Sequence, residues 1–175
     1  FTAFTGAFTT AILVLDQQTF DQIRFWTVGS VAGRDWEIIA WMTPFVIVGM
    51  IGAMLMSRQI TTISLGEDIA RGLGQNSNQV KAISAVMVIL LAGGSVALAG
   101  PVGFVGLIIP HVVRTVCGVD YRWIIPYSAV AGGILVVIAD SVGRIILRPQ
   151  EVPIGVMLAF VGAPFFIYLA RWKVR

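Results

Sequence analysis

The chain has 175 residues, of which 57% are hydrophobic and only 12% are charged, and its formal net charge is +3. Water-soluble domains carry about twice that share of charged residues, so the composition excludes an ordinary water-facing surface. The basic residues are scattered between apolar runs and form no basic face, which excludes a nucleic-acid-binding protein. Membrane lipid is therefore the expected surroundings of the chain.

The apolar residues lie in five uncharged windows, at 1–15, 38–56, 82–113, 124–139 and 152–170. A membrane-spanning helix needs about 20 residues, so the third window is too long for one span. It contains Gly100-Pro101 near its middle, where a turn is expected to divide it into two short helices. The sequence thus predicts an all-α, polytopic transmembrane helical bundle, in which residues 1–175 form part of one domain with about six membrane segments.

The charged residues of the connections predict which side of the membrane each one occupies. Residues 57–81, 114–123 and 171–175 hold eight basic and three acidic residues, whereas 16–37 and 140–151 hold four basic and six acidic. Because Lys and Arg are retained in the cytoplasm, the first set is expected there, including the C-terminus. Five tryptophans near the span ends agree with this topology, since their rings favour the headgroup layer: Trp26, Trp36, Trp41, Trp123 and Trp172.

Small residues recur inside the predicted spans and would let helix backbones approach closely. They are Gly49 and Gly52, Gly93 and Gly94, Gly103 and Gly106, and Gly132 and Gly133. Five prolines in or beside the spans would each free a backbone carbonyl, either around a pathway through the membrane or at simple packing kinks. They are Pro44, Pro110, Pro126, Pro153 and Pro164.

The connection at 57–81 contains the patterned stretch ISLGEDIARGLGQN. Ser64 is placed to cap a helix together with Glu67, and Glu67 can pair with Arg71 one turn later. Gly72 and Gly74 then supply the stop. The pattern predicts a short helix of about two turns.

One face of this short helix is apolar, through Leu65, Ile69 and Leu73. Such a helix between two spans could lodge in a groove on a soluble partner and transmit its movement. It could equally lie on the membrane surface. Both interpretations stay open from the residues alone.

The run GPVGFVGLIIPHVVR, at residues 100–114, predicts a tight re-entry into the membrane followed by a helix. His111, the only histidine, lies one turn before Arg114 and is expected to be a hydrogen-bonded helix-end residue rather than a ligand or base. No Cys, Asp or Glu lies near it in the sequence, so no metal site is predicted. Cys117 is the only cysteine and is expected to be an apolar filler.

The stretch DSVGRIILRPQEVP, at residues 140–153, is expected at the outer end of two spans. Asp140 and Arg144 are one helical turn apart and can pair. Arg144 and Arg148 are also one turn apart and would place two guanidinium groups at the outer rim. These groups could reach lipid phosphates or receive acidic side chains of an external protein.

Four segments together resemble FecCD-type permeases, the membrane subunits of type II ABC importers for iron-siderophore, haem or cobalamin-type chelates. They are LGEDIARGLG, GPVGFVGLIIPHVVR, the step from Asp140 to Arg144, and EVPIGVMLAFVGAPFFIYL. The likeness covers nearly the whole chain, and the six segments resemble spans five to ten of the family. Since the chain also begins at Phe1 without a signal-peptide pattern, it is expected to be a C-terminal part.

The resemblance implies roles for particular residues. The residues expected in the coupling helices that dock on the ATPase are Gly66, Glu67, Ala70, Arg71 and Gly74. Arg144, with Arg148 as a helper, is expected to receive an acidic residue of the substrate-binding protein. The glycine- and proline-rich structural motif consists of Gly100, Pro101, Gly103, Gly106, Pro110 and His111.

The implied partners are a cytoplasmic ATP-binding subunit, an extracytoplasmic substrate-binding protein and a second permease subunit, in a homodimer or as a tandem half. The chain is expected in the cell inner membrane, to bind no cofactor and to be no enzyme. It lacks the GxxxxGK[ST] motif, so ATP and Mg²⁺ are expected on the partner ATPase. The alternatives are an intramembrane enzyme using Ser95 and His111, or a passive channel or scaffold.

Overall fold

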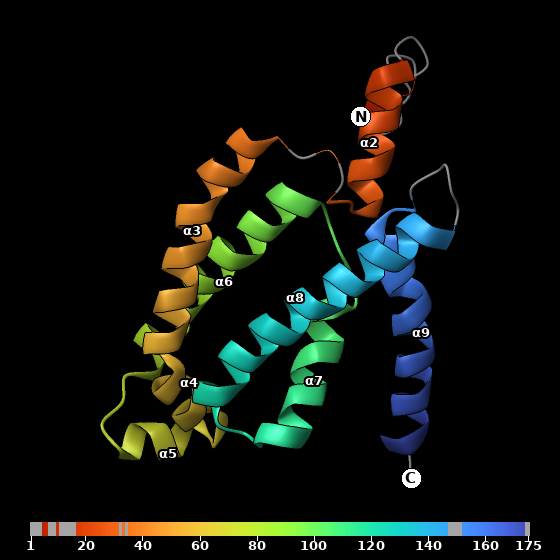
Figure 1. The fold of residues 1–175 in the computed structure, drawn as a ribbon. Coiled ribbons are helices and arrows are strands. Elements are labelled where there is room, and N and C mark those ends of the chain that lie inside the picture. The colour runs from red at the N-terminus through yellow and green to blue at the C-terminus, as the bar shows by residue number, and fades with distance from the viewer. Residues whose placement is uncertain are drawn as a thin grey trace.

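The computed structural model describes residues 5–6, 10, 17–31, 33, 35–146 and 152–173. Every regular element in this part of the chain is a helix, which confirms the predicted all-α fold. In chain order (Figure 1) the helices are α2 (Gln17–Val28), α3 (Trp36–Leu55), α4 (Ser57–Ser64), α5 (Glu67–Gly72), α6 (Ser77–Ala99), α7 (Val105–Cys117), α8 (Tyr121–Ile146) and α9 (Ile154–Lys173). The membrane segment predicted over residues 1–15 lies largely outside the described residues.

Most of the apolar surface of the helices faces outward. The helices α3, α6 and α8 are long and apolar enough to cross a membrane, with mean hydropathies of 2.1, 2.3 and 1.9, and at most 11% of their most apolar windows is buried. The helix α7 and residues 154–165 of α9 are shorter apolar segments. Exposing this much apolar surface to water would be unfavourable, so the chain is part of a multi-pass membrane protein. The total of six membrane segments stays a prediction.

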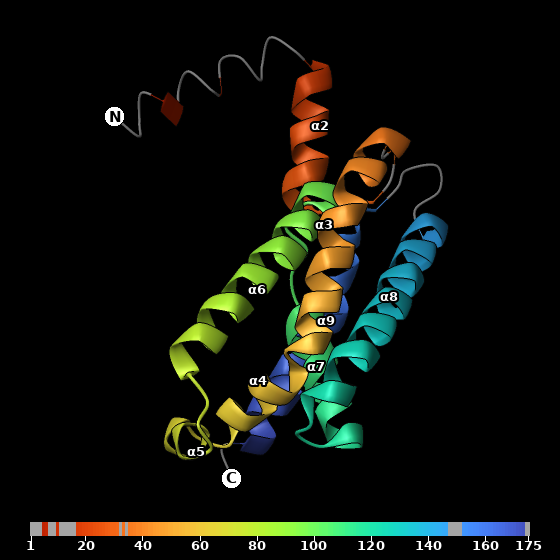
Figure 2. The same ribbon diagram turned by 90° about the vertical axis from the view of Figure 1, so that its left-hand side faces the viewer.

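The helices α3 and α6 run side by side (Figures 1 and 2), and glycines explain their close approach. A Cβ at Gly49 would lie 2.9 Å from Leu91 Cγ, and one at Gly52 would lie 2.2 Å from Met87 Sδ. The prediction of close packing is confirmed there. At four other glycines an added Cβ would have space, because no atom of the described residues from another helix or side chain lies within 4 Å. Close packing is not supported there, at Gly93, Gly103, Gly106 and Gly133.

The long apolar window breaks at the predicted place. The helix α6 ends at Ala99 and α7 begins at Val105, on either side of Gly100-Pro101. Gly100 has a φ of +75°, and a Cβ there would lie 2.3 Å from the carbonyl oxygen of Trp26. Because only glycine fits this left-handed position so close to another backbone, the turn is fixed against the end of α2.

The connection predicted over 16–37 contains the helix α2, which the sequence reading did not identify. Gly29, with a φ of +86°, ends it. Gly29 also accepts a hydrogen bond at 3.2 Å from the backbone N–H of Gly155, and a Cβ at Gly155 would lie 1.7 Å from the carbonyl oxygen of Val28. The absence of a side chain at Gly155 therefore lets the end of α2 rest on the start of α9.

The charged connections gather at two opposite ends of the molecule (Figures 1 and 2). The helix α5, the turn between α7 and α8, and the end of α9 lie at one end, whereas the start of α3 and the end of α8 lie toward the other. This grouping agrees with the two sets of connections derived from the charges. The assignment of the α5 end to the cytoplasm stays a prediction.

Candidate functional site

The helix α5 starts without the predicted serine cap. It begins at Glu67, directly after Gly66, which has a φ of +133°, and no side chain caps it. Ser64 instead ends α4, where its Oγ donates a hydrogen bond to the carbonyl oxygen of Thr61 at 2.6 Å. The predicted cap is therefore wrong, because the Ser64 hydroxyl is satisfied inside a helix that the sequence did not separate from α5.

Glu67 ties α5 to two neighbours. Its Oε2 lies 3.6 Å from Nη2 of Arg71, which confirms the predicted pair. Its Oε1 accepts a hydrogen bond from Nζ of Lys81 on α6. The sequence reading missed Lys81 because it is 14 residues away and follows no helical spacing. Exposed pairs of this kind contribute up to about 1 kcal/mol each, so Glu67 orients α5 more than it stabilises the fold.

The end of α5 is also attached to α4. The helix stops at Gly72, and Gly74, with a φ of +78°, turns the chain as predicted. Nε2 of Gln75 donates a hydrogen bond to the carbonyl oxygen of Gln59 in α4 at 3.0 Å. Ala70 is fully buried. Its burial shows that Ala70 packs α5 against the rest of the chain, and its place in the predicted docking set stays a prediction.

The outward face of this segment is apolar. Leu65, Ile69 and Leu73 are 58%, 53% and 73% exposed. Beside them a polar hollow of about 400 Å³ is lined by Arg71, Gly74, Gln75, Asn76, Ser77 and Asn78. An exposed apolar row next to polar groups is typical of a surface that binds another protein. The segment from Leu65 to Asn78 is thus the candidate functional site at this end.

Ser95 and His111 have separate local partners. The Ser95 hydroxyl donates to the carbonyl oxygen of Leu91 in its own helix, α6, at 2.7 Å. The ring of His111 on α7 stands edge-on to Phe165 of α9, with 6.3 Å between centroids. No contact joins the two candidate catalytic residues in the part of the chain that the structure describes, and that part also contains no group of metal-binding residues. The arrangement gives the enzyme alternative no nucleophile and base pair.

At the opposite end, Arg144 pairs with Asp140 as predicted. Its Nε donates to Oδ2 of Asp140 at 2.8 Å, and its side chain is 48% exposed. This places a half-exposed guanidinium, oriented by a carboxylate, in the last turn of α8. Arg148, the predicted helper, lies outside the described residues.

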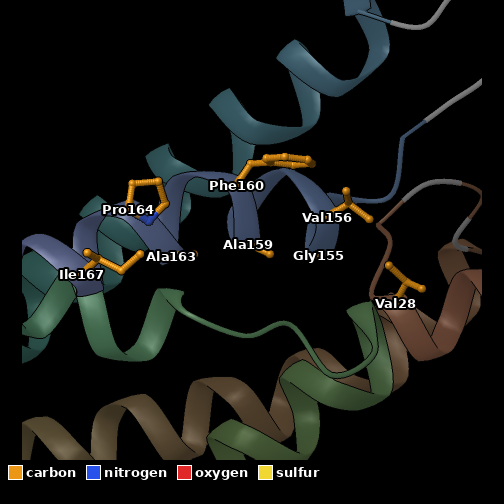
Figure 3. A pocket seen from close by; sticks show the side chains of 8 residues that line it. All are labelled: Val28, Gly155, Val156, Ala159, Phe160, Ala163, Pro164 and Ile167. Atoms are coloured by element: carbon orange, nitrogen blue, oxygen red, sulfur yellow. The ribbon is translucent and has the colours of Figure 1, made fainter.

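A second hollow, of about 580 Å³, follows α9 and the end of α2 (Figure 3). It is lined by Val28, Gly155, Val156, Ala159, Phe160, Ala163, Pro164 and Ile167. Gly155, Ala159 and Ala163 repeat every four residues along α9, a spacing that lets another helix approach closely. Its apolar walls favour a lipid chain or a further helix over a polar ligand.

A family model and two similar curated proteins point to the same family of transport proteins. Residues 1–172 match the FecCD transport family. The chain is 44% identical to the iron(3+)-hydroxamate import system permease protein FhuB of Bacillus subtilis (strain 168), over 98% of this chain and 44% of that protein. It is 40% identical to the Fe(3+)-citrate import system permease protein YfmD of the same organism, over 96% of this chain and 50% of that protein.

The fold is similar to a solved structure of a metal-chelate type ABC transporter in an inward-facing conformation. The TM-score is 0.81 at 26% sequence identity, and the match covers 97% of this chain and 56% of that one. The chain thus spans about half the length of the relatives that it matches.

Proposed function

The chain belongs to the FecCD transport family, and from that premise we propose that it acts in the membrane permease subunit of an ATP-binding-cassette importer. The proposed cargo is an iron(III) chelate, as in the hydroxamate and citrate systems for which two relatives are named. Haem and cobalamin-type chelates belong to the same proposed class. The permease would work by alternating access and would itself make or break no bonds.

The observation that carries the proposal is the construction of α5. This helix is tied to α6 through Glu67 and to α4 through Gln75, while it exposes an apolar row outside the spans. A cytoplasmic ATPase that receives this row in a groove could move the span α6 and the short helix α4 together. ATP and Mg²⁺ would be bound by that subunit.

The outer end of α8 supports a second contact. The carboxylate of Asp140 orients the half-exposed guanidinium of Arg144, which suits it to an acidic side chain of an extracytoplasmic substrate-binding protein. Lipid phosphate remains the alternative occupant. A second permease subunit would complete the pathway, and the apolar hollow along α9 offers additional helix-packing surface.

The location follows from the same proposal. The end that carries α5 and the C-terminal end of α9 would face the cytoplasm, and the protein would reside in the cell inner membrane. The surplus of Lys and Arg in the connections at the α5 end supports this orientation.

Reconstitution of the full-length permease with its ATPase and binding protein in liposomes tests the proposal. We expect uptake of an iron(III) chelate that requires ATP and all three proteins. Arg71→Glu should reduce ATPase association or uptake about tenfold or more, because it reverses charge beside the docking face. Arg171→Glu, at the same end, is the matched control. Uptake that continues without ATP would instead support a passive channel.

A further inference from the structure

The start of α8 is capped in part by another helix. The first N–H groups of a helix have no acceptor within it. At α8 the N–H of Arg122 donates to Oδ1 of Asp120 at 3.0 Å, so Asp120 caps the helix from within the turn. The N–H of Tyr121, the first residue of α8, donates instead to Oγ1 of Thr61 in α4 at 3.0 Å, a contact between residues 60 positions apart. One donor of α8 is therefore satisfied only while α4 stays in place.

The Thr61 hydroxyl is itself oriented. It donates to the carbonyl oxygen of Ser57, one turn earlier in α4, at 2.9 Å. A hydroxyl oxygen has two lone pairs, so it can accept from the N–H of Tyr121 while its own proton is donated. The hydrogen bond thus has a defined direction between two helices that pack against each other.

Tyr121 also contacts α7. Arg114 of α7 donates a hydrogen bond to the Tyr121 hydroxyl, and its guanidinium carbon lies 5.4 Å from the centre of the Tyr121 ring. One residue therefore joins three helices, since its backbone holds α4 and its side chain holds α7. A displacement of α4 would reach both α7 and α8 at this point.

The helix α5 follows α4 directly, after Leu65 and Gly66. The hydrogen bond from Gln75 to Gln59 joins the segment after α5 back to α4. The ion pair of Glu67 with Lys81 connects α5 to α6. The molecule thus offers two routes from α5 into the spans, one to α6 through Lys81 and one to α8 through α4.

We propose that Thr61 is a positioning residue of the importer, through which a displacement of α5 on the ATPase is transmitted to the start of α8. The proposal rests on the proposed function, because it requires α5 to follow an ATPase. Packing contacts between two helices can slide, whereas the N–H of Tyr121, in a half-buried turn, must keep its one acceptor or lose a hydrogen bond. Thr61 therefore keeps α4 and α8 in register during movement.

The test is Thr61→Val in the full-length permease, reconstituted with its ATPase and binding protein. Valine keeps the shape of threonine and removes the acceptor. We expect normal assembly and basal ATP hydrolysis, and a fall of about fivefold in chelate transported per ATP hydrolysed. Thr61→Ser, which keeps the oxygen, should restore the ratio.

Thr62→Val is the matched control. The Thr62 hydroxyl also donates one turn back, to the carbonyl oxygen of Arg58 at 3.0 Å. Unlike the Thr61 hydroxyl, the Thr62 hydroxyl makes no hydrogen bond to α8 within the described residues. Removing it should therefore leave the ratio of chelate transported to ATP hydrolysed unchanged. A wild-type ratio in Thr61→Val, or an equal fall in Thr62→Val, would overturn the proposal.

Two further outcomes separate the possible failures. If Thr61→Val does not assemble, Thr61→Ala takes its place; failure of both variants beside normal Thr62→Val would mean that Thr61 is structural, which also overturns the proposal. If the wild-type complex shows no ATP-dependent uptake, the proposed function itself fails. If the wild type transports and Thr61→Val has the same ratio, only the proposed role of Thr61 is wrong.

Discussion

Glu67 on α5 is paired with Lys81 on α6, across the turn that separates the short helix from the span. Arg71 approaches the other oxygen of the same carboxylate. The carboxylate thus bridges two cations and fixes the angle of a six-residue helix that could not persist alone. The orientation of α5 is a tertiary property, and it can be perturbed without unfolding the spans.

Lys81→Ala should loosen α5 while the bundle stays folded. Because an exposed ion pair contributes up to about 1 kcal/mol, amide hydrogen exchange in α5 should accelerate by up to about fivefold. Exchange in α3 should not change. Arg58→Ala is a suitable control, since the described residues contain no ion pair of Arg58. Unaltered exchange in α5 would show that the pair does not hold the helix.

Exchanging the charges of Asp140 and Arg144 separates two roles of the arginine. The double variant Asp140→Arg with Arg144→Asp keeps an ion pair one turn apart but moves the cation. If Arg144 receives an acidic residue of a binding protein, affinity should fall by about tenfold or more in both Arg144→Asp and the exchanged variant. Recovery of affinity by the exchange would show that only the internal pair matters.

Gly49→Leu should separate α3 from α6. Even the first carbon of the new side chain would lie 2.9 Å from Leu91 Cγ, and overpacking of this kind costs about 1–3 kcal/mol. Thermal unfolding in detergent should shift downward accordingly. Gly93→Leu is the control and should behave like the wild type, because an added Cβ there would meet no side chain or other helix of the described residues within 4 Å. Equal shifts in both variants would contradict the assigned seam.

The ionisation of Asp120 should make the stability of the folded protein depend on pH in the acid range. The side-chain hydrogen bond from Arg122 lowers the pKa of Asp120 below its ordinary value of 3.8. A lowered pKa means that the ionised form stabilises the folded state above pH 3.8, and that this contribution is lost as the pH falls through the lower folded value. Asparagine can still cap the helix, so Asp120→Asn isolates the charge.

The expected result is a stability difference between the wild type and Asp120→Asn at neutral pH that shrinks below pH 3.8. Denaturant unfolding followed at several pH values measures it. A difference that stays constant through the acid range would show that the carboxylate charge contributes nothing at this turn.

Features that depend on local spacing could be predicted from the sequence. The pairs of Glu67 with Arg71 and of Asp140 with Arg144 follow from a separation of one helical turn. The break at Gly100-Pro101 follows from the length of the apolar window and from the turn chemistry of glycine and proline. The all-α class follows from the composition and the apolar windows.

Features that depend on tertiary contacts could not be predicted. Lys81 and Tyr121 meet Glu67 and Thr61 only because helices bring them together over 14 and 60 residues. The Ser64 cap failed for a local reason. Its sequence pattern fits a helix start, but Gly66 interrupts the chain after Ser64, so the serine closes α4 instead.

The membrane side on which α5 lies is the claim on which the importer proposal depends. In the full-length protein, with Cys117 replaced by serine and any other cysteine removed, Asn78→Cys would place one thiol at the exposed start of α6. A membrane-impermeant maleimide should label it in inverted vesicles and not in intact cells, whereas Val31→Cys at the opposite end should show the reverse. Labelling of Asn78→Cys from outside intact cells would contradict the orientation and, with it, docking of α5 on a cytoplasmic ATPase.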